Sequence, residues 1–237
     1  MTVEAFDDPS VVHGYDDWYA TPYGRVSERI HLATLTELLG DPAPGARLLD
    51  IGCATGRKGE HLVERGWSVV GCDPSAGFLA TAAERMPVCR ADGRALPFAD
   101  GAFDAVAITF VLEFLDDPER LLREARRVTR GPIAVIALCG PSYLSARRWL
   151  AGLRGHPVFS QLRHRRAGEW SAVARAAGEA PVRVMKTMVL PPIAAGWMPR
   201  LERWLSRRDL FVGGMVGLEL RIPRGPNLTT AAPPPSD

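Results

Sequence analysis

The sequence predicts an α/β fold, in which helices cover both faces of a mostly parallel sheet. Short apolar runs alternate with helix-like segments along most of the chain. These runs lack a strict apolar and polar alternation, as expected for strands that are buried on both faces. A run of small residues, Gly52 to Gly56, directly follows the first run. Such a run is typical of a tight turn from a strand into a helix.

The first part of the chain predicts a helical cap. Residues 11–24 are rich in aromatic side chains but are interrupted by Pro22 and Gly24, which favours a loop or a short helix packed on another element. Apolar residues then recur at helical spacing over 25–39, and a Gly-Asp-Pro run ends this helix. We expect residues 1–44 to form the cap.

The central part alternates strand and helix signals. We expect strands near residues 47–51, 68–72, 87–90, 103–109 and 132–139. Helices are expected near 56–65, 75–85 and 117–129. Helical crossovers between successive strands make those strands parallel.

The pattern changes after position 140. A helix over 142–153 and a basic cluster, Arg163 to Arg166, indicate a helical insertion over 141–166. The cluster fits the solvated start of the next helix, and a phosphate or nucleic-acid contact is the alternative.

The last elements expected are a helix over 168–177, a strand over 182–190, a helix over 198–207 and a strand over 211–222. The tail, 223–237, holds five prolines and little that packs, so we expect it to be disordered. We expect one domain over residues 1–222.

Length and composition bound the class of protein. The 237 residues are 46% hydrophobic and 24% charged, which is ordinary for a globular domain with a full core. The net charge of +2 requires no polyanionic partner, so no nucleic acid is expected. The first ten residues do not resemble a signal peptide, and no apolar run reaches the ~18 residues of a membrane span. We expect a cytoplasmic protein, either a monomer or a homodimer.

The four cysteines are expected to be reduced structural thiols, because none has C-x-x-C spacing. Cys53 and Cys72 follow strands that should pair, so they are potential neighbours. A metal or arsenic site there is the alternative, but no histidine at ligand spacing accompanies them, and we expect no metal.

One strand-turn-helix-strand segment carries the chemistry. Residues 47–56 are followed after a helix by Val69 to Asp73, which is the outline of a nucleoside-binding βαβ unit. Small residues allow close backbone approach to a ligand, and N–H groups that open a helix favour negative charge. Asp73 is placed to accept hydrogen bonds from both ribose hydroxyls. A dinucleotide fingerprint would need a glycine where Arg57 stands, which disfavours a nicotinamide cofactor.

The spacing Asp50-x-Gly52-x-Ala54-x-Gly56 resembles the first motif of class I S-adenosylmethionine-dependent methyltransferases, of the small-molecule, type 11-like kind. Three further segments resemble later motifs of that superfamily in the same order. They are the adenine-side motif at 91–98, the fourth strand at 103–108 and the helix after it at 117–128.

The resemblance covers about residues 12–222. It implies a Rossmann-like, doubly wound, seven-stranded sheet in three α/β/α layers, with an antiparallel last strand. It also implies S-adenosyl-L-methionine as the cofactor. The cofactor-binding positions that it implies are Gly52, Cys53, Ala54, Gly56, Asp73, Pro74, Asp92, Gly93, Thr109 and Phe110.

Several of these residues have a second interpretation. Asp73 would hold the ribose or cap the next helix, and Asp92 would accept from the adenine amino group or serve a turn with Gly93. Phe110 would form the floor near the sulfonium or pack in the core. Asp50 is expected to orient the turn through backbone N–H groups.

Methyl transfer is an in-line displacement on an already electrophilic sulfonium, so alignment suffices and no catalytic triad is required. The sequence identifies no catalytic residue. Glu113, His13 and Tyr15 are candidates, and His31 and His156 are further candidates for a general base. A salt bridge is the alternative for Glu113. Aromatic residues expected to wall the acceptor pocket are Tyr15, Trp18, Tyr19 and Tyr143, together with Trp149, and simple core packing is the alternative for each of them.

These observations predict an enzyme that transfers a methyl group to an O, N or C nucleophile of a small molecule. A non-catalytic cofactor-binding module and, less favoured, a nicotinamide-dependent oxidoreductase are the alternatives. Base methylation is disfavoured, because Thr109 to Leu112 replace the N/D-P-P-Y/F tetrapeptide expected after the fourth strand.

Overall fold

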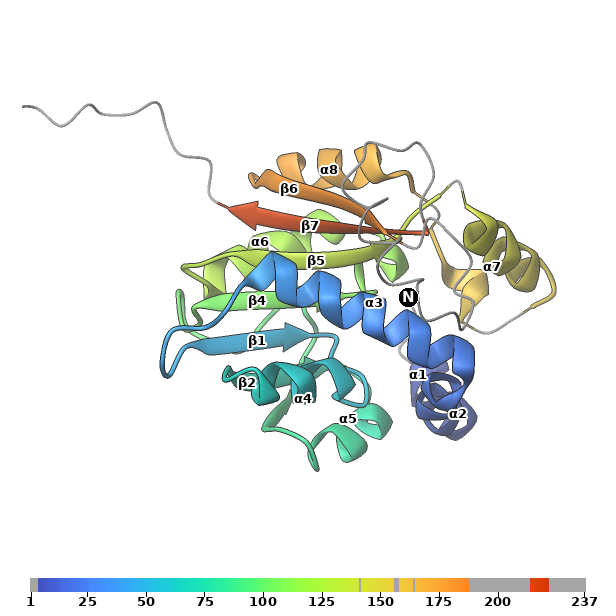
Figure 1. The fold of residues 1–237 in the computed structure, drawn as a ribbon, viewed down its shortest axis with the longest axis horizontal. Coiled ribbons are helices and arrows are strands. Elements are labelled where there is room, and N and C mark those ends of the chain that lie inside the picture. The colour runs from blue at the N-terminus through green and yellow to red at the C-terminus, as the bar shows by residue number, and fades with distance from the viewer. Residues whose placement is uncertain (1–3, 141, 156–157, 164, 188–213, 222–237) are drawn as a thin grey trace, which may run out of the picture.

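The computed structural model describes residues 4–140, 142–155, 158–163, 165–187 and 214–221. These residues form three layers, in which one seven-stranded sheet lies between two layers of helices (Figure 1). The strands are β1 (Arg47–Ile51), β2 (Ser68–Asp73), β3 (Val88–Arg90), β4 (Ala105–Thr109), β5 (Ile133–Leu138), β6 (Ala180–Thr187) and β7 (Met215–Arg221).

The strand order is β3-β2-β1-β4-β5-β7-β6. All pairs are parallel except those of β7, which runs antiparallel to β5 and β6. The chain builds outward from β1 through β2 and β3, and then returns to place β4 on the other side of β1. The doubly wound sheet with an antiparallel last strand is therefore confirmed. In such sheets ligands bind beyond the carboxyl ends of the strands where the order reverses, here beside β1 and β4.

Helices cover both faces of the sheet. They are α1 (Glu4–Asp7), α2 (Pro9–Ala20), α3 (Pro22–Leu39), α4 (Arg57–Glu64), α5 (Ala76–Ala82), α6 (Pro118–Val128), α7 (Tyr143–Leu153) and α8 (Ala167–Ala176), with short 3-10 turns η1 (Leu112–Phe114) and η2 (Phe159–Gln161).

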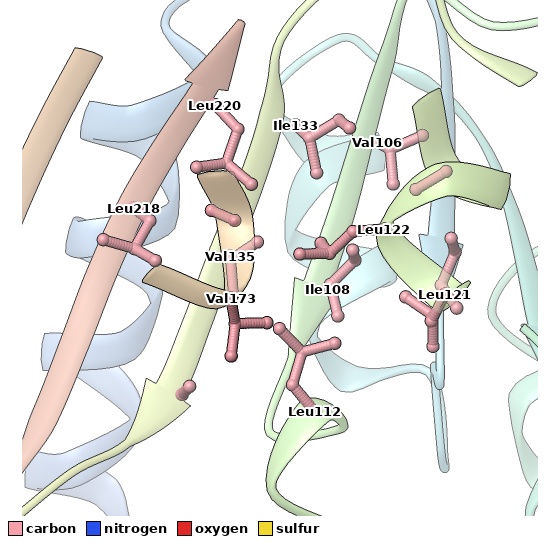
Figure 2. Packing of buried hydrophobic residues seen from close by; sticks show 14 of the residues in the cluster. Val106, Ile108, Leu112, Leu121, Leu122, Ile133, Val135, Val173, Leu218 and Leu220 are labelled. Carbon is pink, nitrogen blue, oxygen red and sulfur yellow. The ribbon is translucent and has the colours of Figure 1, made fainter. Parts of the chain in front are cut away.

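The central strands alternate their side chains between two cores. Ala105 and Ala107 of β4 belong to the core under α3, α4 and α5. Val106 and Ile108 belong to the core under α6 and α8, where they pack near Leu121 and Leu122 of α6 (Figure 2). The small alanines allow the long helix α3 to approach the sheet closely. This two-sided burial explains why the strands read as apolar runs.

The amino-terminal segment forms a helix, which is one of the two expected alternatives, and the next helix begins earlier than expected. Residues 9–20 form α2, and Pro22 begins α3 instead of interrupting a loop. The Thr21 hydroxyl caps α3 by accepting from the Gly24 backbone N–H at 2.9 Å. Proline suits the first helical turn because its missing N–H would be unpaired there. Gly24 is needed because a Cβ would overlap the carbonyl of Trp18.

Some expected elements lie outside the described residues: the helix over 198–207, the ends of the strands expected at 182–190 and 211–222, and the tail. The described part of the insertion contains α7 and η2. Among the described residues, no helix combines the length and apolar character that crossing a membrane requires.

Candidate functional site

The turn after β1 has backbone angles that favour small residues. Gly52, Ala54 and Gly56 all have positive φ, at 72°, 48° and 83°. At Gly52 a Cβ would also overlap the side chain of Val111, which follows β4. The backbone of the turn at Gly52 therefore packs directly against the Val111 side chain at the end of β4.

Asp73 at the end of β2 ties this turn in place. Its Oδ2 accepts from the Ala54 N–H at 3.0 Å, and its Oδ1 accepts from the Ser75 N–H at 2.9 Å. The side chain is buried. Burial raises the pKa of Asp73, and the two backbone hydrogen bonds oppose that rise. Each oxygen keeps a lone pair free for a further donor.

One alternative and one expectation about these acids are wrong. The cap of α5 is Ser75, whose Oγ accepts from the Phe78 N–H at 3.2 Å, so Asp73 is not the helix cap. Asp50 does not orient the turn, because the N–H groups of Gly52 and Cys53 donate to the Cys72 carbonyl. The Asp50 Oδ2 is buried without a partner among the described residues, and burial raises its pKa to about 7.

A buried lysine lies beside the turn. Lys58, the second residue of α4, is 5% exposed. Its Nζ donates to the hydroxyls of Tyr19 at 2.8 Å and Tyr15 at 3.2 Å. It also lies over the Tyr19 ring, 4.6 Å from the centroid. Among the described residues no carboxylate forms an ion pair with this ammonium group.

The amino-terminal helices lie across this edge of the sheet. The Ser75 hydroxyl donates to the Phe6 carbonyl at 3.0 Å, and the Phe6 ring packs edge-on against Phe114 at 5.4 Å. Asp16 of α2 accepts from the Thr55 hydroxyl at 2.7 Å and from Arg85 at 2.9 Å. The segment from α1 to α2 thus connects the loops that follow β1, β2 and β4.

The end of β4 combines polar and aromatic groups. Thr109 is buried, and Phe110 has a positive φ of 58°. The Phe110 ring packs edge-on against His31 of α3 at 4.7 Å. Glu113 is fully buried, and its Oε1 accepts from the Leu138 N–H at 3.1 Å. Burial raises the pKa of Glu113 to about 7.

Asp92 and Gly93 lie after β3. Asp92 Oδ1 accepts from the Arg94 N–H at 2.9 Å, and the Arg94 guanidinium pairs with Oδ2 at 2.7 Å. The Arg94 hydrogen bonds hold the pKa of Asp92 below its usual range. A Cβ at Gly93 would come within 2.8 Å of Ile51 and Leu121 side-chain atoms. Asp92 therefore has the role in a turn that was its alternative interpretation. Its contact with adenine stays a prediction.

The other candidates are dispersed. Tyr15 and Tyr19 face Lys58, whereas Trp18 is 39% exposed. The Trp149 side chain is 56% exposed, so the described structure does not place it as a pocket wall. His13 is exposed, with its Nδ1 at 2.6 Å from the Pro9 carbonyl oxygen.

Tyr143 is the first residue of α7, but the structure does not describe its side chain. His156 lies outside the described residues. The basic cluster lies at the start of α8, where Arg165 stacks 4.9 Å from the Trp170 ring centroid and Arg163 pairs with Asp116. Its placement agrees with the helix-start interpretation.

Among the described residues, no disulfide joins any of the four cysteines. Within the described ranges, no group of three or more His, Cys, Asp or Glu side chains is arranged to hold a metal ion.

Two buried basic residues near the site were not predicted from the sequence. Lys58 and Arg148 stand on helices, where lysine and arginine are normally solvent-exposed. Lys58 had one usable signal, its position two residues after the glycine turn. Arg148 had none.

Comparison with known proteins agrees with this geometry. Residues 49–132 match the methyltransferase domain family. The demethylmenaquinone methyltransferase of Renibacterium salmoninarum is 38% identical over 105 residues, which are 42% of this chain and 44% of that protein. The enzyme of the same name from Corynebacterium urealyticum is 42% identical over 104 residues, 43% and 45% of the two chains. The matched segment thus spans less than half the length of these curated relatives.

Solved structures share the whole fold. A Thermotoga maritima methyltransferase described as a possible histamine N-methyltransferase superposes with a TM-score of 0.67 at 22% identity, over 92% of this chain and 99% of that one. Geranyl diphosphate C-methyltransferase from Streptomyces coelicolor, in complex with S-adenosyl-L-homocysteine, gives 0.61 at 19% identity, over 81% and 78%. At these identities the likeness concerns the fold. Together with the family match, it shows that the chain is similar to methyltransferases in the sequence of residues 49–132 and in its fold.

Proposed function

We propose that this protein transfers a methyl group from S-adenosyl-L-methionine to an O, N or C nucleophile of a small molecule, with residues 1–222 acting as one domain. The observation that carries the proposal is the Ala54 to Asp73 hydrogen bond. It holds the glycine turn and a buried carboxylate together beside β4, where a nucleoside and its sulfonium would lie. The relatives named above are described as methyltransferases.

The described residues fit this cofactor. The positive φ of Gly52 and its close contact with Val111 place the backbone of the turn at the end of β4, where the cofactor would lie. Asp73 retains acceptor capacity for ribose hydroxyls, and Asp92 lies at the same edge for the adenine amino group. Lys58 is a buried cation beside the turn without a carboxylate partner in the described structure. It would hold the carboxylate of the methionine part, since buried charges need an opposite charge.

When bound, S-adenosylmethionine supplies an electrophilic methyl group on a sulfonium. The role of the chain is then to align the acceptor with that methyl group and to exclude water, and such positioning supplies ~7 to 11 kcal/mol of a typical barrier. Phe110, which stands beside the turn with its ring against His31, would form the floor of the reacting centre. The helices α1 and α2 lie where they would cover it.

Calorimetric titration tests the proposal directly. We expect S-adenosylhomocysteine to bind the wild-type protein and NAD not to bind. Release of adenosylhomocysteine is then measured during incubation with phenols, quinones, amines and thiols. Binding of the cofactor without turnover on any class would favour the non-catalytic module, and tight binding of NAD alone would favour an oxidoreductase.

A further inference from the structure

Four buried polar atoms near the end of β4 have no hydrogen-bond partner among the described residues. They are His31 Nδ1, Thr109 Oγ1, Glu113 Oε2 and Arg148 Nη1. They come from four elements, α3, β4, η1 and α7. Buried polar groups in folded proteins are paired in about nine cases of ten. Four unpaired atoms in one region therefore point to a polar ligand. We call these four residues the polar cluster.

The members of the cluster are neighbours. The His31 ring contacts the Phe110 ring, and Thr109 precedes Phe110. Ala105 and Ala107 face the core under α3, so the two-residue alternation of a strand directs Thr109 to the same side. Arg148 interacts electrostatically with His31 and Glu113. The cluster thus lies beside Phe110, adjacent to the glycine turn proposed for the cofactor.

The cluster has unbalanced positive charge. Arg148 forms no ion pair with any described residue, and burial lowers its pKa. Glu113 supplies only a partial negative charge near neutral pH, because burial raises its pKa to about 7. Burial, together with the charges of Lys58 and Arg148, holds the pKa of His31 well below its usual range, so its imidazole is neutral. A buried guanidinium is best stabilised by an anionic oxygen.

We propose that the polar cluster is the acceptor site and that the acceptor is a planar phenol or enol, whose hydroxyl passes its proton to His31 Nδ1 and whose oxygen pairs with Arg148. This inference rests on the proposed function. Thr109 and Glu113 supply the remaining polar contacts, and the Phe110 and Tyr19 rings beside His31 suit a flat apolar body.

The acceptor O–H bond breaks and its proton moves to the imidazole, which becomes a cation. The oxygen lone pair forms the bond to the methyl carbon. The carbon–sulfur bond breaks and its electrons return to sulfur, giving neutral adenosylhomocysteine. Because Arg148 balances the transient oxyanion, formation of the imidazolium is not opposed by an unpaired positive charge.

The experiment measures adenosylhomocysteine release with 4-methoxyphenol, phenol, 1-naphthol and 4-nitrophenol. The acidity of the hydroxyl rises along this series, and only 1-naphthol has a larger ring. With His31→Asn we expect kcat/KM for the weakly acidic phenols to fall by ~100-fold or more, the usual contribution of a general base. For 4-nitrophenol, about half of which is ionised at neutral pH, we expect a fall of less than ~5-fold, since the ionised form needs no proton to be removed.

Controls separate this role from a structural one. His61→Asn makes the same change at a half-exposed histidine bonded to Thr36, and should leave all rates within ~2-fold. An equal loss across the series for His31→Asn, with normal binding of adenosylhomocysteine, would overturn the role of His31. In the ternary complex of the wild-type protein with adenosylhomocysteine, we expect the pKa of bound 4-nitrophenol, followed by absorbance, to be lowered. Arg148→Met should abolish this lowering and raise KM for 4-nitrophenol.

Failure of this inference differs from failure of the proposed function. A protein that binds adenosylhomocysteine and methylates an amine or thiol, but no phenol or enol, refutes the acceptor class and supports methyl transfer. A protein that does not bind adenosylhomocysteine refutes both.

Discussion

Lys58 and Tyr19 are joined by a hydrogen bond of 2.8 Å, although 39 positions separate them in the chain. The bond links the first turn of α4, which follows the glycine turn, to the last turn of α2. It places a positive charge in a buried site that also contains the Tyr15 hydroxyl and the Phe110 ring. The proposed ligand of this charge is the cofactor carboxylate.

Lys58→Met is expected to weaken binding of S-adenosylhomocysteine by ~10- to 100-fold, because a hydrogen bond to a charged group contributes about 1.5 to 3 kcal/mol. Binding of 5′-methylthioadenosine, which lacks the amino-acid part, should stay within ~3-fold. Calorimetry with both ligands measures the difference. Arg57→Met is the matched control, since the adjacent Arg57 pairs with Glu28 instead. Equal losses for the two ligands would refute the carboxylate assignment.

Asp73→Ala should weaken both ligands by more than ~10-fold, because both contain the ribose that Asp73 is proposed to hold. Asp73→Asn should do the same, since an amide nitrogen would face the N–H of Ala54 or Ser75, both of which are donors. The exposed pair Asp100 and Arg127 offers the control Asp100→Asn. Unchanged affinity of the Asp73 variants would remove the ribose assignment.

Asp16→Asn tests the contact between α2 and the glycine turn. The change weakens the bonds to Thr55 and Arg85, so the free energy of unfolding in urea should fall by about 1 to 2 kcal/mol. If α2 covers the cofactor, the dissociation rate of S-adenosylhomocysteine should also rise. The neighbouring exposed Asp17→Asn should change stability by no more than ~0.5 kcal/mol. A loss of stability with an unaltered dissociation rate would contradict a covering role.

Glu113 is expected to make stability depend on pH. Its pKa is raised from 4.5 to about 7 by burial, so between these values the native state holds a proton that the unfolded state has released. Stability contributed by the protonated carboxyl is present below pH ~4.5 and is lost as the pH rises through ~7, about 3 kcal/mol in all.

Glu113→Gln should remove this dependence. The difference in the free energy of unfolding between the variant and the wild type should favour the variant more at pH 8 than at pH 5. Urea unfolding at the two pH values measures it. Its carbonyl oxygen can still accept from Leu138. Glu84→Gln, at an exposed position, serves as control. Parallel pH profiles of wild type and Glu113→Gln would show that Glu113 does not titrate in this range.

The local order of the chain could be predicted from its residues. Buried parallel strands need apolar side chains on both faces, so runs such as Ile133 to Leu138 were recognisable without their neighbours. The turn at Gly52 was equally recognisable, because positive φ and a close approach to Val111 exclude larger side chains. The motif spacing then indicated the cofactor, because it depends on residues that follow each other in the chain.

The role of each acid was decided only by the tertiary structure. Asp50 and Asp73 both follow apolar strand residues, and the sequence assigned the turn contact to the wrong one. Asp73 takes it because β2 pairs with β1 in a register that sets Ile51 opposite Cys72, and this brings the end of β2 to the Ala54 N–H. No local sequence pattern predicts the register between β1 and β2.

The sequence by itself determined the order of the elements, the sheet type and the nucleoside-binding turn, because backbone preference and apolar periodicity act over a few residues. The tertiary structure decided which polar groups meet. Lys58 lies against Tyr19 of α2, and Arg148 of α7 lies close enough to His31 and Glu113 to interact with them electrostatically. Charges from distant segments acquire a shared environment only when folding removes water from between them, so their chemistry is a property of the packed structure.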